Sequence, residues 1–386
     1  MAWKECDRMS QREEFTALAV VPGANFSELC RRFGISRKTG YKWRRRYQAN
    51  PDAPLSDRSR RPTRSPGKTS DLVEQRVLEI RDAHPAWGGR KIRKRMQNLG
   101  DSEVPSASTI AAIVKRHGRV SPQESQKRRA FCRFQRATAN ELWQVDFKGE
   151  FKLLNKKYCH PLTVLDDHSR FSLGIAACGN QRRQTVQSHF RKIFGIYGLP
   201  DSIYVDNGNP WASSSNALRY TRFSAWLLRH GVEVIFGRPY HPQGRGKLER
   251  FHRTLKLEVL QGRSLKNLKE AQACFDPWRD VYNLQRPHEA LDLATPAEHY
   301  QVSPRKFVEQ RGVFEYNDRF EVRRANRVGQ FGFGGHTYRI SEAFRDQPIG
   351  LSATKEDGVW DVWYCRFVVG RLNQRTQKIE RHQPRG

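Results

Sequence analysis

Apolar residues in the first third of the chain recur at steps of three and four, the spacing of one face of an α-helix. Two such regions, 11–48 and 71–118, are separated by residues 51–70, which are rich in proline and arginine and poor in apolar side chains. The pattern therefore predicts two small helical domains, residues 1–50 and residues 71–120, joined by an extended basic linker over residues 51–70.

Particular residues in these domains are expected to begin helices or to face the core. Ser27 is expected to cap the helix that precedes Gly34, and Ser36 the helix that follows it. Either Ser106 or Ser108 is expected to cap the last helix of the second domain. An apolar face beginning at Leu72 is expected to be buried. Both layouts resemble a helix-turn-helix, in which the second helix enters the major groove of DNA. An ordinary helical hairpin with a solvated basic face is the alternative.

The period changes at Asn140, where strand-like runs begin. Residues 139–304 read as three strands, a helix (181–197), a strand, a helix (215–230), a strand and a helix. The first three strands are joined by short turns, which indicates an antiparallel meander. This order predicts a mixed sheet with helices packed against it. A basic connector over residues 121–138 leads into this region.

Short apolar runs separated by Gly, Asn and Asp turns follow residue 305. They predict a small basic β-barrel, or a sandwich, over residues 305–386 that binds DNA. The expected strands are Val313–Tyr316, Arg319–Val322, Gln330–Phe333, His336–Ile340, Ile349–Ala353 and Val359–Phe367.

The balance of charge points to a polyanionic partner. The chain of 386 residues has a formal net charge of +30, spread over most of its length, so nucleic acid is the leading candidate. A membrane surface is the weaker alternative, and the sequence holds no apolar run long enough to span a bilayer. Seven cysteines, none in a C-x-x-C pair, argue against a disulfide framework or a zinc ribbon and for a cytoplasmic protein.

Basic residues gather in three stretches that are expected to contact DNA phosphates. The first is the second helix of the N-terminal domain, the second is the linker, and the third begins just before residue 246. The candidates are Arg37, Lys38, Lys42, Arg44, Arg45, Arg60, Arg61, Arg245, Lys247, Arg253 and Lys256.

Three carboxylates stand at positions that a mixed sheet could bring together. Asp146 lies in a strand-forming run, and alternation places it on the opposite face from Val145 and Phe147. Asp206 follows the short strand S-I-Y-V, and ligand sites favour the carboxyl ends of such strands. Glu249 opens a helix. Unpaired carboxylates repel one another and need a cation, and oxygen ligands suit Mg²⁺ or Mn²⁺.

Two other acids in the same region, Asp166 and Asp167, lie in a turn. We expect them to shape that turn and not to bind metal.

The segments W-Q-V-D-F-K, V-D-N-G-N-P and H-P-Q-G-R-G-K-L-E-R-F-H-R-T-L-K resemble the three catalytic blocks of the retroviral-integrase superfamily, in particular the DDE transposases of bacterial insertion sequences. The likeness covers residues 139–300, and the flanking domains fit the same family's layout. It implies a multidomain α/β protein: an RNase H-like mixed-sheet catalytic core, with helix-turn-helix modules before it and a small β-barrel after it.

The resemblance also implies the chemistry. Asp146, Asp206 and Glu249 would be the catalytic and metal-binding triad, with Asp146 bridging two Mg²⁺ ions, for which Mn²⁺ may substitute. The protein would cleave transposon-end DNA and transfer the freed 3′-OH into target DNA. Its partners would be transposon-end DNA, target DNA and a second copy in a homodimer or higher oligomer, in the bacterial cytoplasm at the nucleoid.

Two other classes of protein compete with this interpretation. A ribonuclease H usually carries an acid on the helix after the meander, whereas residues 181–197 contain neither Asp nor Glu. A non-catalytic DNA-binding or regulatory protein derived from a transposase remains the alternative from a different class. The sequence does not assign the reading of the transposon end to either helix-turn-helix module.

Overall fold

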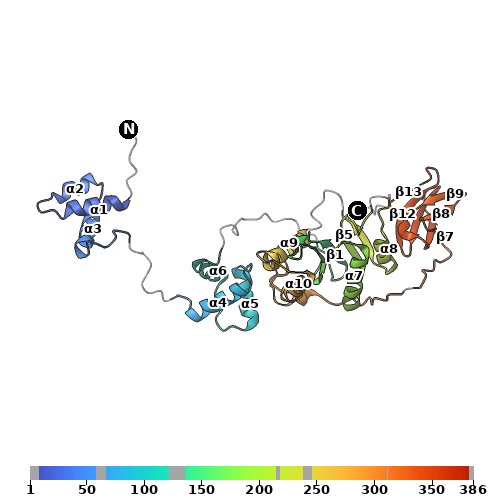
Figure 1. The fold of residues 1–386 in the computed structure, drawn as a ribbon, viewed down its shortest axis with the longest axis horizontal. Coiled ribbons are helices and arrows are strands. Elements are labelled where there is room, and N and C mark those ends of the chain that lie inside the picture. Colours follow the sequence, from blue (N-terminus) through green and yellow to red (C-terminus); the bar gives the residue numbers. More distant parts are fainter. Residues whose placement is uncertain are drawn as a thin grey trace. The chain divides into compact units, whose positions relative to one another are not determined.

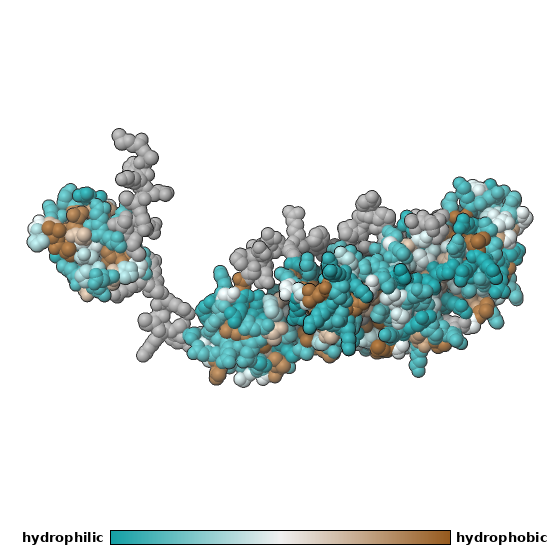
Figure 2. Space-filling model, viewed as in Figure 1, coloured by the Kyte–Doolittle hydropathy of each residue, from teal (hydrophilic) through white to brown (hydrophobic). Residues whose placement is uncertain are grey.

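The chain divides into two compact units, Met1–Lys68 and Thr69–Gly386 (Figure 1). The computed structural model describes residues 8–57, 67–120, 135–213, 218–237, 246–310 and 312–381. None of the helices in these ranges is both long enough and apolar enough to cross a membrane. The face shown in Figure 2 is mostly hydrophilic, with small and separate apolar patches.

The first unit is a bundle of short helices around Phe15, Cys30 and Trp43. Gly34 takes a positive φ of 64° in the turn between the second and third helices, which a residue with a side chain rarely adopts. The helices are α1 (Arg8–Ala19), α2 (Phe26–Arg32) and α3 (Arg37–Ala49).

Of the two helix caps expected in this unit, one is observed and the other is not. The Ser36 side chain caps α3 by accepting a hydrogen bond from the backbone N–H of Thr39. The expected cap at Ser27 is wrong, because the side chain of Asn25 accepts the corresponding bond from Glu28 and α2 begins earlier.

The second unit begins with another helical set, α4 (Asp71–Ala83), α5 (Gly89–Leu99) and α6 (Ala107–Arg116). Its core includes Val77, Trp87 and Ile92. Ser106, the first of the two caps considered, accepts a bond from Thr109 at the start of α6. Leu72 is 80% exposed, so its expected burial is wrong: it lies in the first turn of α4, outside the buried face.

A mixed six-stranded sheet forms the centre of the second unit. Strands β1, β3 and β4 make the expected antiparallel meander, while β5 and β6 extend the sheet parallel to β1. The strands are β1 (Leu142–Phe147), β2 (Phe151–Lys152), β3 (Tyr158–Asp166), β4 (Ser172–Cys178), β5 (Ser202–Val205) and β6 (Glu233–Phe236).

Helices cover both faces of this sheet, as the order of elements predicts. On one face, the first core joins Trp143 and Val145 of β1 to α7 and α8. On the other face, the second core joins Leu165 of β3 to α9 and α10. The arrangement is consistent with an RNase H-like fold. The helices are α7 (Arg183–Tyr197), α8 (Arg222–Arg229), α9 (Gly246–Leu255), which continues into a π-helical turn (Lys256–Leu260), and α10 (Leu268–Leu284).

The helix expected over residues 215–230 is shorter than predicted. It begins at Arg222, because Thr221 and Ser224 form a reciprocal capping box there. Residues 214–217 lie outside the described ranges.

The C-terminal part contains an open five-stranded sheet, in the order β13-β12-β11-β10-β7, and a separate hairpin of β8 and β9. The expected barrel is not confirmed, since no pairing between β13 and β7 closes the sheet in the described residues. The strands are β7 (Glu321–Arg324), β8 (Gln330–Phe333), β9 (His336–Arg339), β10 (Pro348–Ala353), β11 (Val359–Tyr364), β12 (Phe367–Asn373) and β13 (Lys378–Glu380).

Three of the expected strands differ from the observed ones in this part. The strand expected at Arg319–Val322 is found two residues further along the chain, as β7. The run Val359–Phe367 is divided between β11 and β12 by a turn in which Cys365 has a φ of 50°. Val313–Tyr316 is not a strand. Its Tyr316 ring lies against Gly350 of β10 instead, so closely that a Cβ on Gly350 would lie 2.5 Å from the ring.

The C-terminal sheet and the central sheet share the first core. Phe344 is fully buried and makes an edge contact with the ring of Tyr220, with centroids 5.4 Å apart. The guanidinium of Arg366, in the turn before β12, donates to the carbonyl oxygen of Gly231, beside β6. The two sheets are therefore parts of one packed unit.

Candidate functional site

Asp146 lies near the end of β1, on the face of the sheet that carries the second core. Its neighbours Val145 and Phe147 pack into the first core, so alternation turns the Asp146 side chain to the opposite face. This part of the prediction is confirmed. The carboxylate is half-buried, and its Oδ1 accepts a hydrogen bond from the backbone N–H of Phe147 at 2.8 Å.

Asp206 comes directly after β5, the parallel neighbour of β1. The register pairs Gln144 with Tyr204, and Asp146 and Asp206 each follow two residues later. Continuing the register places the two acids level with each other on the same face, on strands about 4.8 Å apart. Asp146 therefore lies near the carboxyl end of β1, and Asp206 lies directly after the carboxyl end of its parallel neighbour β5.

The turn after β5 holds the Asp206 carboxylate. Its Oδ1 accepts a hydrogen bond from the backbone N–H of Gly208 at 2.9 Å. A Cβ at Gly208 would lie only 3.3 Å from both carboxylate oxygens. The neighbouring Asn207 donates its side-chain N–H to the carbonyl of Gly237, after β6, so this loop is fastened to the next parallel strand.

Glu249 lies in the first turn of α9 with an exposed side chain. The opposite side of the helix is buried through Leu248 and Phe251 in the second core. His252 follows Glu249 by three positions and therefore stands on the same stripe of the helix. Because Leu248 and Phe251 are buried and Glu249 is exposed, the Glu249 side chain points away from the second core.

His252 connects this stripe to the strand that carries Asp146. Thr163 of β3 is the residue directly opposite Asp146 in the sheet. Its hydroxyl donates to the Asp146 carbonyl at 2.9 Å and lies 2.7 Å from Nε2 of His252. Because the hydroxyl proton is already used, Nε2 of His252 must be the donor of the second bond. Burial, and then the charge of Lys148, lower the pKa of His252 to about 3, so the ring is neutral.

The lysines Lys148 and Lys256 lie beside this face of the sheet. The pKa of Lys148, two residues after Asp146, is lowered by burial and then by the charge of Lys256. Lys256 is exposed, as is Arg253 on α9. The site therefore combines acids at the carboxyl ends of strands with basic side chains that could bind a phosphate backbone.

The three predicted ligands do not form a closed metal cage. Across the ranges that the structure describes, no group of three or more His, Cys, Asp or Glu side chains is placed to hold a metal ion. Asp146 lies near the carboxyl end of β1, Asp206 directly follows the parallel strand β5, and Glu249 lies in the first turn of α9. All three offer only oxygen donors, the set that Mg²⁺ and Mn²⁺ prefer.

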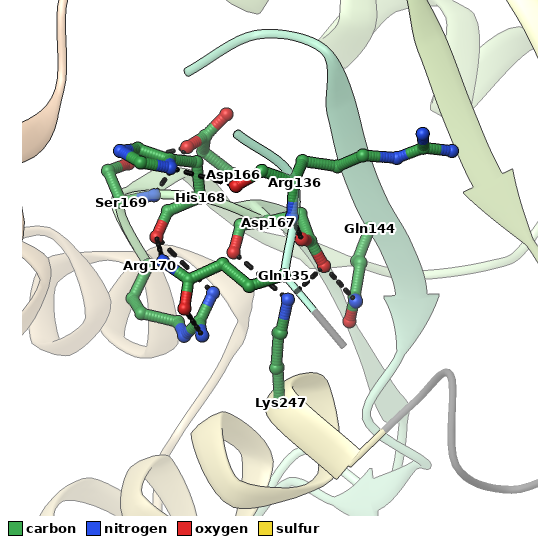
Figure 3. Close-up of polar contacts among 9 residues, drawn as sticks. All are labelled: Gln135, Arg136, Gln144, Asp166, Asp167, His168, Ser169, Arg170 and Lys247. Atoms are coloured by element: carbon green, nitrogen blue, oxygen red, sulfur yellow. Dashed lines mark hydrogen bonds and ion pairs between the residues drawn. The ribbon is translucent and has the colours of Figure 1, made fainter. Parts of the chain in front are cut away.

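A second group of polar side chains lies at the turn between β3 and β4 (Figure 3). Asp166 and Asp167 are both fully buried there. Asp166 accepts hydrogen bonds from the backbone N–H and the hydroxyl of Ser169, at 2.8 and 2.6 Å, which confirms its expected role in shaping the turn. Burial raises the pKa of Asp166, and these bonds oppose that effect.

Lys247 belongs to this group and not to an open phosphate track, which corrects its sequence interpretation. Its side chain is only 15% exposed, and Nζ lies 2.5 Å from Oδ1 of Asp167. Burial lowers the pKa of Lys247 to about 8, against the opposing effect of the bond to Asp167. In the sequence, the two adjacent acids of L-D-D-H-S-R marked this place, but nothing near them indicated that Lys247 would pair with Asp167.

The basic residues predicted on α3 are mostly on its open side. Arg37, Lys38, Lys42 and Arg45 are exposed, and Arg44 is half-buried with its guanidinium 5.7 Å from the ring centroid of Phe26. A shallow hollow on this side is lined by Lys38, Thr39, Tyr41, Lys42 and Arg45. Arg60, Arg61 and Arg245 lie outside the described residues.

Models of known protein families match the N-terminal, central and C-terminal parts of the chain. Residues 136–242 and residues 230–296 each match an integrase core domain. Residues 9–55 and residues 39–114 match homeodomain-like domains, and residues 320–380 match the C-terminal domain of the IS481 family transposases. The integrase core and the DNA-binding modules recognised from the sequence are thereby confirmed.

Two relatives come from bacterial insertion elements. The chain is 24% identical over 237 residues to "Insertion element IS476 uncharacterized 39.2 kDa protein" of Xanthomonas euvesicatoria, covering 60% of this chain and 66% of that protein. It is 23% identical over 287 residues to "Insertion element IS407 uncharacterized 31.7 kDa protein" of Burkholderia multivorans, covering 72% of this chain and 92% of that protein.

A solved structure aligns with part of the chain. The catalytic core domain of the HTLV-2 integrase, in complex with magnesium, aligns with 43% of this chain and 99% of its own length, at 15% identity and a TM-score of 0.33.

Proposed function

We propose that this chain, which carries integrase core domains and the C-terminal domain of the IS481 family transposases, is a transposase that acts on the ends of its own mobile element. It hydrolyses a phosphodiester bond at the transposon end in a metal-dependent reaction. It then transfers the freed 3′-OH to a phosphodiester of target DNA, without a covalent link between protein and DNA.

The observation that supports this proposal most directly is the strand register. Gln144 of β1 pairs with Tyr204 of the parallel strand β5, and Asp146 and Asp206 each follow two residues later. The sheet face that they share is covered by α9, the helix that carries Glu249. Carboxylates from a central strand, an adjacent strand end and a neighbouring helix would hold two divalent ions. When bound, such ions would lower the pKa of a water nucleophile and stabilise charge on the entering and leaving oxygens.

The chain's other residues position and attract the substrate. The neutral ring of His252, on the same side of α9 as Glu249, contacts the hydroxyl of Thr163. That hydroxyl donates to the backbone carbonyl of Asp146. Exposed cations are available to the DNA backbone from Arg253 on α9 and Lys256 in the π-helical turn after it, and from Arg37, Lys38, Lys42 and Arg45 on α3. Since two transposon ends must be joined to one target, we propose that at least two copies of the chain assemble on DNA.

The test is single replacement of each proposed ligand by its amide. Asp146→Asn, Asp206→Asn and Glu249→Gln are each expected to abolish end cleavage and strand transfer, because each removes one anionic ligand. Affinity for end DNA should stay the same, since the exposed basic residues are unchanged. Cleavage is measured on a labelled duplex carrying the element's end, with Mg²⁺ or Mn²⁺, and binding by fluorescence anisotropy.

Asp201→Asn is the matched control. Asp201 directly precedes β5, at the opposite end of the strand from Asp206. Its exposed carboxylate pairs with Arg305 at 2.8 Å. This variant should therefore cleave like the unchanged chain. Robust cleavage by any of the three ligand variants would refute the triad. If the unchanged chain binds end DNA but never cuts it with either metal, the protein is instead a non-catalytic DNA-binding regulator.

A further inference from the structure

We infer that Asp167 and Lys247 are positioning residues for the proposed metal site, joining the strand that carries Asp146 to the helix that carries Glu249. Neither residue is expected to touch metal or DNA. The inference rests on the proposed function, because it concerns how two of the proposed ligands are held in place.

The link begins on β1. The side-chain amide of Gln144 donates to Oδ1 of Asp167 at 2.8 Å. Gln144 is two residues before Asp146 and therefore on the same face of the strand. Asp167 is also fixed to this strand through its backbone, because its N–H donates to the carbonyl of Leu142 at 2.9 Å.

The link ends on α9. Nζ of Lys247 contacts Oδ1 of Asp167 at 2.5 Å and also donates to the Asp167 backbone carbonyl at 3.2 Å. Lys247 is two residues before Glu249, in the same first turn of the helix. In Figure 3 the Lys247 side chain extends from α9 to Asp167, and Gln144 meets the same carboxylate from β1.

The junction is closed and leaves little freedom for Asp167. Its side chain is fully buried, and its Oδ2 accepts a third bond, from the backbone N–H of Arg136 at 2.9 Å. A single buried carboxylate thus fixes β1, the start of α9 and the end of the segment that leads into the sheet. Groups that orient metal ligands in this way commonly affect metal affinity without binding the metal.

The double variant Asp167→Asn/Lys247→Met tests the inference. Removing both charges leaves neither buried and unpaired, so the fold should survive, whereas the charged tie between sheet and helix is lost. Gln144→Leu breaks the link from the strand side and provides a second, independent variant. Lys247→Arg keeps the charge. Glu309→Gln, which breaks the exposed Arg191–Glu309 pair at 2.7 Å, is the matched control.

The main readout is Mn²⁺ binding to the full chain, followed by electron paramagnetic resonance. Thermal unfolding and anisotropy with end DNA are measured alongside. The double variant and Gln144→Leu are expected to bind Mn²⁺ about tenfold more weakly, with unchanged DNA affinity and a folded state that melts cooperatively. Lys247→Arg should recover most of the affinity, and Glu309→Gln should bind like the unchanged chain.

The outcomes separate this inference from the proposed function. Unchanged Mn²⁺ affinity in the folded double variant or in folded Gln144→Leu overturns the positioning role and leaves the proposed function intact. If Asp146→Asn binds Mn²⁺ as well as the unchanged chain does, the metal site itself is wrong and the inference fails with it. Weaker binding in both link variants, with recovery in Lys247→Arg, supports the inference.

Discussion

Gly40 lies where α3 packs against both other helices of the first unit. A Cβ at this position would lie 2.7 Å from Sγ of Cys30 and 2.9 Å from the ring of Phe15, both of which are buried core residues. Alanine normally stabilises a helix interior by about 1 kcal/mol relative to glycine. Overpacking a core commonly costs about 1–3 kcal/mol, so the steric effect should dominate here.

Gly40→Ala is therefore expected to lower the free energy of unfolding of the first unit, by up to about 2 kcal/mol after the helix gain is subtracted. Calorimetry of the full chain would show it as a lower melting temperature for that unit. Gly195→Ala in α7 is the matched control, because a Cβ there meets no atom within 4 Å and should stabilise its own unit slightly. A Gly40→Ala protein that melts higher would contradict the packing argument.

At the scale of elements, α3 combines a buried side with an open basic side. Trp43 is 4% exposed, and the guanidinium of Arg12 lies 4.1 Å from its ring centroid. On the open side, Lys42 and Arg45 line the shallow hollow described above. The helix is thus anchored through one aromatic residue while its cations remain available to phosphates.

Lys42→Ala/Arg45→Ala is expected to weaken binding to end DNA and to reduce its salt dependence. Each lost phosphate contact lowers the magnitude of the slope of log affinity against log salt by about 0.9. Anisotropy titrations at several salt concentrations measure this slope. Arg31→Ala, at an exposed residue of α2 that pairs with Glu28 at 3.2 Å, should leave it unchanged. An equal slope in the double variant would remove α3 from the DNA interface.

Elements defined by local signals could be predicted from the sequence, whereas contacts between distant segments could not. Ser36 and Ser106 cap helices as expected, since capping involves residues only three apart. The position of Asp146 on its face of β1 also followed from alternation, and the position of Asp206 directly after β5 followed from the turn after Val205. In contrast, the pairing of Lys247 with Asp167 joins residues 80 positions apart, and periodicity carries no information about such a partner.

The same limit explains the C-terminal domain. Its short strands were visible as apolar runs, but closure into a barrel depends on pairing between the first and last strands. Tyr316, expected in a strand, packs its ring against Gly350 and accepts a hydrogen bond from the backbone N–H of Cys365 at 2.9 Å. The residues before β7 therefore cover the sheet and do not extend it.

At the scale of the whole molecule, the second unit is held together by a core that passes from the central sheet into the C-terminal sheet. Phe344→Ala is expected to cost about 3–5 kcal/mol, because its ring contacts Tyr220 and Tyr364, with centroids 5.4 and 4.8 Å away. Hydrogen exchange should show faster exchange in both α8 and β11. The melting of the first unit should not change.

Val328→Ala is the control for this prediction, because Val328 is 47% exposed and little packing is lost. Faster exchange confined to β11, with α8 protected as before, would show that the two sheets unfold independently in spite of their shared core.

This continuous core limits how domains can be exchanged between this chain and related proteins. A chimera that imports a foreign C-terminal segment would also have to import its counterparts of Leu218, Tyr220 and the carbonyl at Gly231, which meet that segment here. The productive junction for such swaps is therefore near the boundary at Lys68 and Thr69, where a different N-terminal helical domain could be grafted without disturbing the hydrophobic interior of the second unit.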